Sequence, residues 1–272
     1  MGKIDRGYDP TDVKSIVEYS QKLVGKTLRQ VCDAPELADP HRRRGSFGNA
    51  VEEYFFKYDI NSDSRADFEE AGLEVKATPV KRVKRRGHEE LVAKERLVLG
   101  MIDYHSVVNE DFEHSHVMEK CRDLLLISYL YEPDKNPVDY IVEAAGEWGI
   151  PADDLPQVKS DWLNVVDKVR SGHAEDISGS DTMYLEACTK AKDSTVRTSQ
   201  PFSNVLAKPR AWALKSSYIT AVQRKLIDRM QELPRSPSEK GLDLLVLVTK
   251  RFSPYFGMTK DELREKFGLS ES

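Results

Sequence analysis

The sequence predicts an α/β fold in which a mixed central sheet is flanked by helices. Short apolar or alternating runs bounded by turn residues predict strands at 73–78, 94–102, 123–130 and 137–142. Apolar side chains at three- and four-residue spacing predict helices in 9–31, from 47 onward and in 157–175. With 272 residues, of which 39% are hydrophobic, the chain is long enough to bury a substantial core.

The elements follow in chain order. Residues 9–31 read as an amphipathic helical region that begins at Asp9-Pro10-Thr11. Gly45 and Gly48 suit a turn into the next helix, and the nearly continuous apolar run at 123–130 is typical of a buried strand. In the helix predicted at 157–175 the inward residues are Trp162, Val165, Val166 and Val169.

The domain organisation predicted from these signals is one catalytic domain over residues 1–232, followed by a tail over 233–272. The tail starts with a proline-containing linker at 233–238 and continues into two short helices, 241–248 and 259–267. Thr259 and Glu262 have the spacing of a capping box at the start of the second helix.

The pattern D-x6-E-x-K, formed by Asp67, Glu74 and Lys76, lies at the start of the strand predicted at 73–78. Because strand side chains alternate, Glu74 and Lys76 should share one face while Leu73 and Val75 face a core. Carboxylates are ligands for Mg²⁺, and a lysine beside them can orient an attacking water at a phosphate. The alternative is an amphipathic strand with a solvated polar face.

A third carboxylate, Glu52, falls near the first turn of the helix predicted from residue 47. It could join the strand pair as a ligand for a metal ion or for a metal-bound water. The alternative is that Glu52 and Glu53 only stabilise a helix N-terminus through its dipole.

Five blocks then occur in a fixed order: G-S-F-G-x-x-x-E at 45–52, D-F-x-x-x-G-L-E-V-K-A-T-P at 67–79, A-K-E-R-L-V-L at 93–99, L-E-A-C-T-K-A at 185–191, and R-A-W-A-L-K-S at 210–216. Together they resemble the MutH family, which includes the mismatch-repair nicking enzyme and GATC-cutting type II restriction endonucleases. The resemblance covers residues 45–226 and is closer to the restriction enzymes. It implies a restriction-endonuclease-like PD-(D/E)xK fold and Mg²⁺-dependent hydrolysis of duplex DNA at GATC, leaving 5′-phosphates.

The resemblance also implies roles for individual residues. The catalytic set would be Glu52, Asp67, Glu74, Lys76 and Lys94. Asp67 and Glu74 would ligate the metal together with the backbone carbonyl of Val75. Restriction relatives continue into a second, effector copy of the domain, to which residues 233–272 would lead.

Positive charge is local in a chain whose net charge is −5. The run 81–86 is expected to form a basic loop beside the active site that contacts phosphates, the alternative being an ordinary solvated loop. The blocks at 185–191 and 210–216 fall where the family keeps its base-reading and phosphate-contacting loops. The expected DNA contacts are Arg44, Lys81, Arg82, Lys84, Arg85, Arg86, Thr189, Lys190, Arg210 and Lys215.

Other signals narrow the class of protein. Glycine-rich nucleotide-binding patterns are absent, so no nucleotide cofactor is expected, and no apolar run is long enough to span a membrane. Three widely spaced cysteines indicate a reducing compartment, and we expect a cytoplasmic protein that is monomeric in solution and pairs on DNA. Two alternatives stay open: a repair-type nicking enzyme driven by a partner ATPase, and a catalytically silent DNA-binding effector module.

Overall fold

The computed structural model describes residues 6–32, 47–58, 66–232 and 259–267. The chain is divided into two compact units, each assembled from separate stretches of sequence. The first takes residues 1–91, 123–148 and 222–272, and the second takes residues 92–122 and 149–221. No helix among the described residues is long and apolar enough to cross a membrane.

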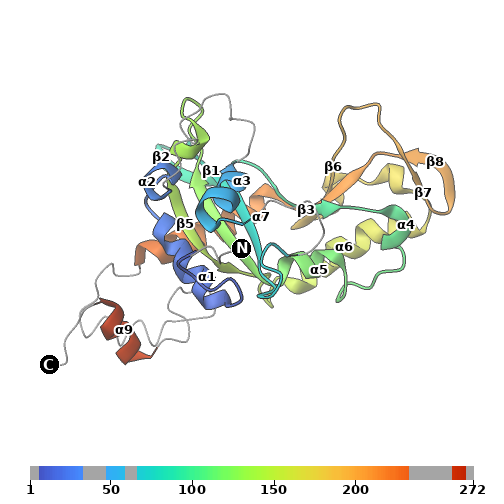
Figure 1. Ribbon diagram of the computed structural model, residues 1–272. Coiled ribbons are helices and arrows are strands. Elements are labelled where there is room, and N and C mark those ends of the chain that lie inside the picture. The colour runs from blue at the N-terminus through green and yellow to red at the C-terminus, as the bar shows by residue number, and fades with distance from the viewer. Residues whose placement is uncertain (1–5, 33–46, 59–65, 233–258, 268–272) are drawn as a thin grey trace. The chain divides into compact units, whose positions relative to one another are not determined.

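The first unit contains a mixed four-stranded sheet in the order β2-β1-β4-β5, with β1 parallel to β4 and β4 antiparallel to β5. Its strands are β1 (Glu74–Arg85), β2 (His88–Ala93, which ends in the second unit), β4 (Leu124–Leu130) and β5 (Val142–Trp148). Its N-terminal helices are α1 (Val13–Ser20), η1 (Gln21–Leu23), α2 (Leu28–Val31), α3 (Phe47–Ala50) and the π-helix η4 (Val51–Phe56). These helices lie beside the sheet (Figure 1), and the prediction of a mixed α/β fold is confirmed.

The core of the first unit lies between the N-terminal helices and one face of the sheet. This core contains Leu73, which directly precedes β1, and Val75 on β1. Leu125 and Ile127 contribute to it from β4. The neighbours of these residues in the strands, Glu74 among them, point to the other face because side chains alternate along a strand. The predicted alternation around residues 73–76 is therefore confirmed.

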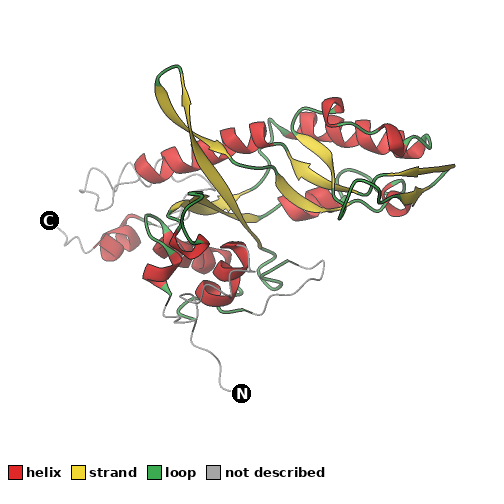
Figure 2. Ribbon diagram, turned by 90° about the horizontal axis from the view of Figure 1, so that it is seen from above, coloured by secondary structure: helices red, strands yellow, loops and turns green. Residues whose placement is uncertain are grey.

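The second unit contains a three-stranded antiparallel sheet in the order β3-β9-β6 and a separate hairpin β7-β8. Its strands are β3 (Leu97–Met101), β6 (Leu185–Thr189), β7 (Thr198–Gln200), β8 (Ser203–Ala207) and β9 (Arg210–Leu214). Its helices are α4 (Tyr104–Val107), α5 (His116–Cys121) and α6 (Leu155–Arg170), and the short 3-10 turns are η6 (Ala174–Asp176) and η7 (Gly179–Asp181). The four inward residues predicted for the helix at 157–175 are buried on α6, which ends earlier than expected. Figure 2 distinguishes the helices from the strands by colour.

The remaining elements complete the chain. Helix α7 (Ser216–Glu232) starts in the second unit and ends in the first, and α9 (Lys260–Phe267) lies in the first. The capping box predicted at Thr259 is confirmed, since Glu262 Oε2 accepts from the Thr259 N–H and Thr259 Oγ1 accepts from the Glu262 N–H. The linker at 233–238 and the helix predicted at 241–248 lie outside the described residues, so they stay predictions.

Two of the predicted elements are wrong. Residues 137–142 do not form a strand: Asn136 accepts from the Val138 N–H and starts the 3-10 turn η5 (Pro137–Asp139), and β5 begins only at Val142. A proline at the first position suits such a turn because it lacks the N–H that a strand would need. The region 9–31 is also not one helix, because the chain turns at Gly25 between η1 and α2.

Candidate active site

The D-x6-E-x-K pattern folds into a tight antiparallel turn that leads into β1. Phe68 and Leu73 form an isolated bridge, with Phe68 N–H donating to the Leu73 carbonyl at 3.0 Å and Leu73 N–H donating back at 3.2 Å. Gly72 has a φ of +67°, which favours glycine at this position of the turn. The turn brings Asp67 next to the first residues of β1, as the sequence predicts.

Asp67 is fixed to β1 by a backbone hydrogen bond. Its Oδ2 accepts from the Val75 N–H at 2.8 Å, so the carboxylate lies beside the strand that carries Glu74 and Lys76. Lys76 Nζ and Glu74 Oε1 form an ion pair at 2.5 Å, with the Glu74 side chain largely buried. The shared face predicted for Glu74 and Lys76 is therefore present.

Glu52 lies in the π-helix η4 and is electrostatically coupled to this turn. Burial, and then the charges of Asp67 and Glu74, raise the pKa of Glu52 to about 7, while Lys76 opposes that rise. Coupling of this kind requires the three carboxyl groups to be close together in a partly buried place. The structure therefore brings Glu52 to the pattern on β1, and π-helical turns are frequent at functional sites.

Aromatic packing holds the two segments of the site together. The ring of Phe68, the neighbour of Asp67, lies 5.4 Å from the Phe56 ring and 5.2 Å from the Tyr58 ring between centroids, both in edge-to-face geometry. Such pairs stabilise by about 0.5–1.5 kcal/mol beyond the area they bury. They connect the end of η4, four residues after Glu52, to the turn that carries Asp67.

Tyr58 is a member of the site that the sequence did not indicate. Its hydroxyl is buried and has no hydrogen-bond partner among the described residues. Burial and the charges of Asp67 and Glu52 hold the pKa of Tyr58 above its ordinary value, so the phenol keeps its proton. No sequence signal pointed to it, because Lys57 ends the helix in a left-handed conformation and breaks the helical spacing from Glu52.

The donor set fits a divalent cation such as Mg²⁺. Carboxylate oxygens of Glu52, Asp67 and Glu74 are hard ligands, and burial, together with the charges of the other two carboxylates, favours a proton on Glu52 up to about pH 7. Val75 is placed by its N–H bond to Asp67, and its carbonyl stays a predicted metal ligand beside Asp67 and Glu74. Lys94 is exposed in the bend between β2 and β3 and belongs to the second unit, so its catalytic role also stays a prediction.

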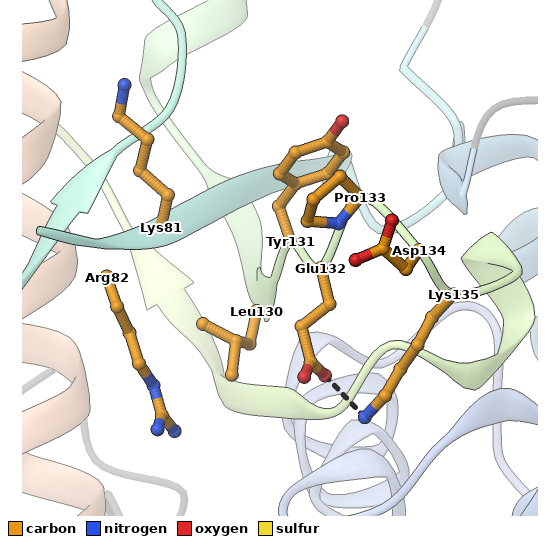
Figure 3. Close-up of a pocket in the computed structure, with 8 residues that line it drawn as sticks. All are labelled: Lys81, Arg82, Leu130, Tyr131, Glu132, Pro133, Asp134 and Lys135. Atoms are coloured by element: carbon orange, nitrogen blue, oxygen red, sulfur yellow. Dashed lines mark hydrogen bonds and ion pairs between the residues drawn. The ribbon is translucent and has the colours of Figure 1, made fainter.

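The basic run at 81–86 is not the loop that the sequence predicts. Residues 81–85 continue β1, and the turn into β2 is made by Arg86 and Gly87, both with positive φ. Lys81 and Arg82 point to opposite sides of the strand (Figure 3), as alternation requires. Lys81, Arg82, Lys84, Arg85 and Arg86 are exposed or half-exposed, but they do not form one continuous basic face.

A cavity of about 570 Å³ lies beside Lys81 and Arg82 (Figure 3). Its lining also contains Glu132 and Lys135, which form an ion pair at 2.7 Å. The lining mixes both signs of charge and includes none of the residues of the D-x6-E-x-K pattern. The cavity therefore shares no lining residue with the group formed by Glu52, Asp67 and Glu74.

The predicted DNA contacts in the second unit divide into two kinds. Thr189 and Lys190 are exposed at the end of β6 and keep their predicted role. Arg210 is buried and donates to the carbonyls of Ala187, at 2.6 Å, and Ile177.

Lys215 likewise donates to the backbone, to the carbonyls of Gly179, at 2.6 Å, and Thr182. Cations that donate to backbone carbonyls stabilise the fold, so the placement of Arg210 and Lys215 does not fit the predicted phosphate contacts. Arg44, the remaining predicted contact, lies outside the described residues.

Comparison with known proteins finds similarity to the same family that the sequence blocks resemble. Residues 56–161 match the model of the DNA mismatch repair enzyme MutH, a stretch that contains Asp67, Glu74, Lys76 and Lys94. The chain is 31% identical to the type II restriction enzyme Sau3AI of Staphylococcus aureus over 95% of its own length and 53% of that protein.

The chain is also 24% identical to the DNA mismatch repair protein MutH of Serratia proteamaculans, over 78% of this chain and 92% of that one. The match to the MutH protein of Shigella flexneri is 25% identical over the same shares. The chain thus spans about half the length of the restriction relative and nearly all the length of the repair relatives.

Proposed function

From the premise that this chain carries a MutH-family domain, we propose that it is a site-specific endonuclease of double-stranded DNA. The observation that carries the proposal is the assembly of Glu52, Asp67 and Glu74 around Lys76 at the entrance of β1. The finer proposal is a type II restriction activity that depends on Mg²⁺, cuts at GATC and leaves 5′-phosphates. The restriction-endonuclease-like PD-(D/E)xK fold belongs to the same proposal.

The residues of the site support this chemistry in distinct ways. Bound Mg²⁺ would supply Lewis-acid stabilisation of the charge that develops on the phosphate. Lys76, paired with Glu74 in a partly buried place, holds a positive charge where the attacking water and a phosphate oxygen would lie. Attack of water in line forms the new P–O bond, breaks the bond to the 3′-oxygen, and leaves a 3′-hydroxyl and a 5′-phosphate.

The second candidate is a repair-type nicking endonuclease, because the chain is also 24% identical to a DNA mismatch repair protein MutH over 78% of its own length. Incubating the protein with Mg²⁺ and an unmethylated plasmid, then mapping the ends, separates the candidates. Double-strand breaks at GATC support the restriction enzyme, and nicks support the repair-type enzyme. Binding to GATC without any cleavage would instead indicate an effector module.

Because one cluster of this kind cuts one strand, a double-strand break needs two copies on a palindrome or two successive nicks. We propose a monomer that pairs on DNA. Analytical ultracentrifugation should give a monomer without DNA and two copies per duplex with it. A stable dimer in the absence of DNA would contradict this arrangement.

The raised pKa of Glu52 leads to a test of the metal site that needs no substrate. The folded state holds a proton on this carboxyl up to about pH 7, whereas the unfolded chain loses it near 4.5. The folded state therefore binds more protons between these values, and its stability falls as pH rises through this window. Glu52→Gln should raise the metal-free stability at pH 8 by roughly 1 kcal/mol, a figure discounted for partial exposure.

The measurement is chemical denaturation of both proteins at pH 5 and pH 8, with and without Mg²⁺. Added Mg²⁺ should stabilise the unmodified protein at pH 8 and stabilise Glu52→Gln less, because a ligand has been lost. Glu53→Gln, an exposed neighbour on the same helix, is the matched control and should behave like the unmodified protein. Equal stabilisation of all three proteins by Mg²⁺ would show that Glu52 is not a ligand of the metal.

A further inference from the structure

Three of the six large hydrophobic side chains that are exposed among the described residues lie on the hairpin formed by β7 and β8. Gln200 pairs with Ser203, so Pro201 and Phe202 form the two-residue turn at its tip. Phe202 is 74% exposed, and Leu206 and Val205 on β8 are 55% and 53% exposed. At its base the hairpin packs on helical elements of its own unit, with β7 against α4 and β8 against η6. Clustered exposed apolar side chains usually mark a binding surface.

The conformation of Phe202 is unfavourable for folding alone. Its φ is +65°, in the left-handed region, which costs an L-residue with a Cβ about 1–2 kcal/mol relative to glycine. The side chain gains little in return, because most of it is in water. A residue that is strained and exposed at once is typical of a position kept for function.

The turn that carries Phe202 is fixed by hydrogen bonds of Gln200 and by close packing on Gly172. Gln200 is buried, accepts from the Ala174 N–H at 2.8 Å and donates to the Val205 carbonyl at 2.7 Å. The backbone of the turn packs directly on Gly172, where a Cβ would lie 2.8 Å from the Phe202 carbonyl oxygen. The ring is therefore presented outward by a fixed backbone, which lowers the entropy that binding would cost.

The charge around the hairpin indicates what it binds. Residues 189–209 contain four exposed cations, Lys190, Lys192, Arg197 and Lys208, and a single acid, Asp193. One further carboxylate, that of Glu175, contacts the base of the hairpin by accepting from Gln200 Nε2 at 2.5 Å. Lysine is depleted at protein–protein interfaces. In a nucleic acid, by contrast, the cations could bind the phosphates while the apolar tip contacts the stacked bases. Of the two classes of partner, a nucleic acid duplex fits this composition better than a protein.

We propose that the β7–β8 hairpin is a wedge that inserts Phe202 into a base step of the DNA duplex while the surrounding cations bind phosphates. The inference rests on the proposed function, since it concerns the same DNA. Apolar side chains inserted between base pairs unstack the step and bend the duplex, and the aromatic ring replaces part of the lost stacking. The hairpin would thereby distort the DNA next to the recognised sequence.

The test uses GATC duplexes that carry 2-aminopurine at successive positions outward from the site, with Ca²⁺ in place of Mg²⁺. Fluorescence anisotropy of an end label reports binding, and 2-aminopurine emission reports unstacking. The unmodified protein should raise the emission at one position. Phe202→Gly should abolish this rise and weaken binding about tenfold, as expected for loss of one stacked base.

Controls separate the wedge from a loss of structure. Phe202→Gly should melt at an equal or higher temperature than the unmodified protein, because glycine removes the left-handed strain. Phe202→Tyr should restore the emission. Met183→Ala removes an exposed apolar side chain of the same unit outside the hairpin and should change neither readout.

The results that would overturn the proposal are distinct. If the unmodified protein binds with no rise in emission at any position, and Phe202→Gly binds equally well, the wedge is refuted while the nuclease proposal stands. If Phe202→Gly alters only the sedimentation of the protein without DNA, the hairpin is a protein contact. If the unmodified protein binds no duplex at all, the proposed function fails, and the wedge with it.

Discussion

Replacing Asp67 by asparagine should lower the rate of DNA cleavage by at least about a thousandfold while leaving the fold and DNA binding intact. The carboxylate of Asp67 contributes negative charge to the cluster with Glu52 and Glu74. Asparagine removes that charge. Its amide oxygen can still accept from the Val75 N–H, which Asp67 Oδ2 binds at 2.8 Å.

The choice of asparagine over alanine follows from this hydrogen bond. Asp67→Ala would leave the Val75 N–H without its partner, which costs about 1–3 kcal/mol and confuses lost chemistry with lost stability. Single-turnover cleavage of a GATC duplex, with binding measured in Ca²⁺, separates the two effects. Glu70→Gln, an exposed carboxyl in the same turn, should cleave normally. Loss of binding by Asp67→Asn in proportion to lost cleavage would show that the residue is structural.

The largest loss of stability is expected at Asp161, a carboxylate on α6 that is only 1% exposed. Its oxygens accept from three consecutive backbone N–H groups, those of Met183 at 2.9 Å, Tyr184 at 2.6 Å and Leu185 at 2.9 Å. Gln157 Nε2 donates a fourth bond at 2.9 Å. This carboxylate therefore fixes the start of β6, the strand that ends at Thr189.

Asp161→Asn should destabilise the protein by about 3–5 kcal/mol, because one acceptor oxygen replaces two and the new NH₂ group faces N–H donors. Urea denaturation followed by circular dichroism measures the loss. Asp167→Asn, on the exposed side of the same helix, should change stability by less than about 0.5 kcal/mol. A loss at Asp161 as small as the loss at Asp167 would mean that the buried bonds contribute little to stability.

Much of the proposed catalytic arrangement could be predicted from sequence, because it depends on residues that are close together in the chain. Glu74 and Lys76 are two residues apart in a strand, so alternation alone places them on one face, and Gly72 marks the turn that returns Asp67 to them. The buried strand at 124–130 and the inward face of α6 were likewise readable from periodicity. These features depend on neighbours within a few residues.

Other features depended on contacts that sequence spacing does not encode. Whether a cation faces DNA or a buried carbonyl is decided by which loop packs over it, and so Arg210 and Lys215 were assigned to DNA although they hold the backbone of the second unit. The basic run was predicted to be a loop because five of its six residues are cations, so it shows no alternation of apolar and polar residues. In the structure β1 nevertheless continues through Arg85.

The sequence by itself determined the mixed α/β fold, the resemblance to the MutH family and the order of the carboxylates and lysine in the D-x6-E-x-K pattern. Each of these follows from residue type and short-range period. Only the tertiary structure decided that Glu52 is close enough to Asp67 and Glu74 to hold a proton near neutral pH, that Tyr58 joins them, and that Phe202 is held outward under strain. Burial, electrostatic coupling and backbone strain are set by parts of the chain that meet only after folding.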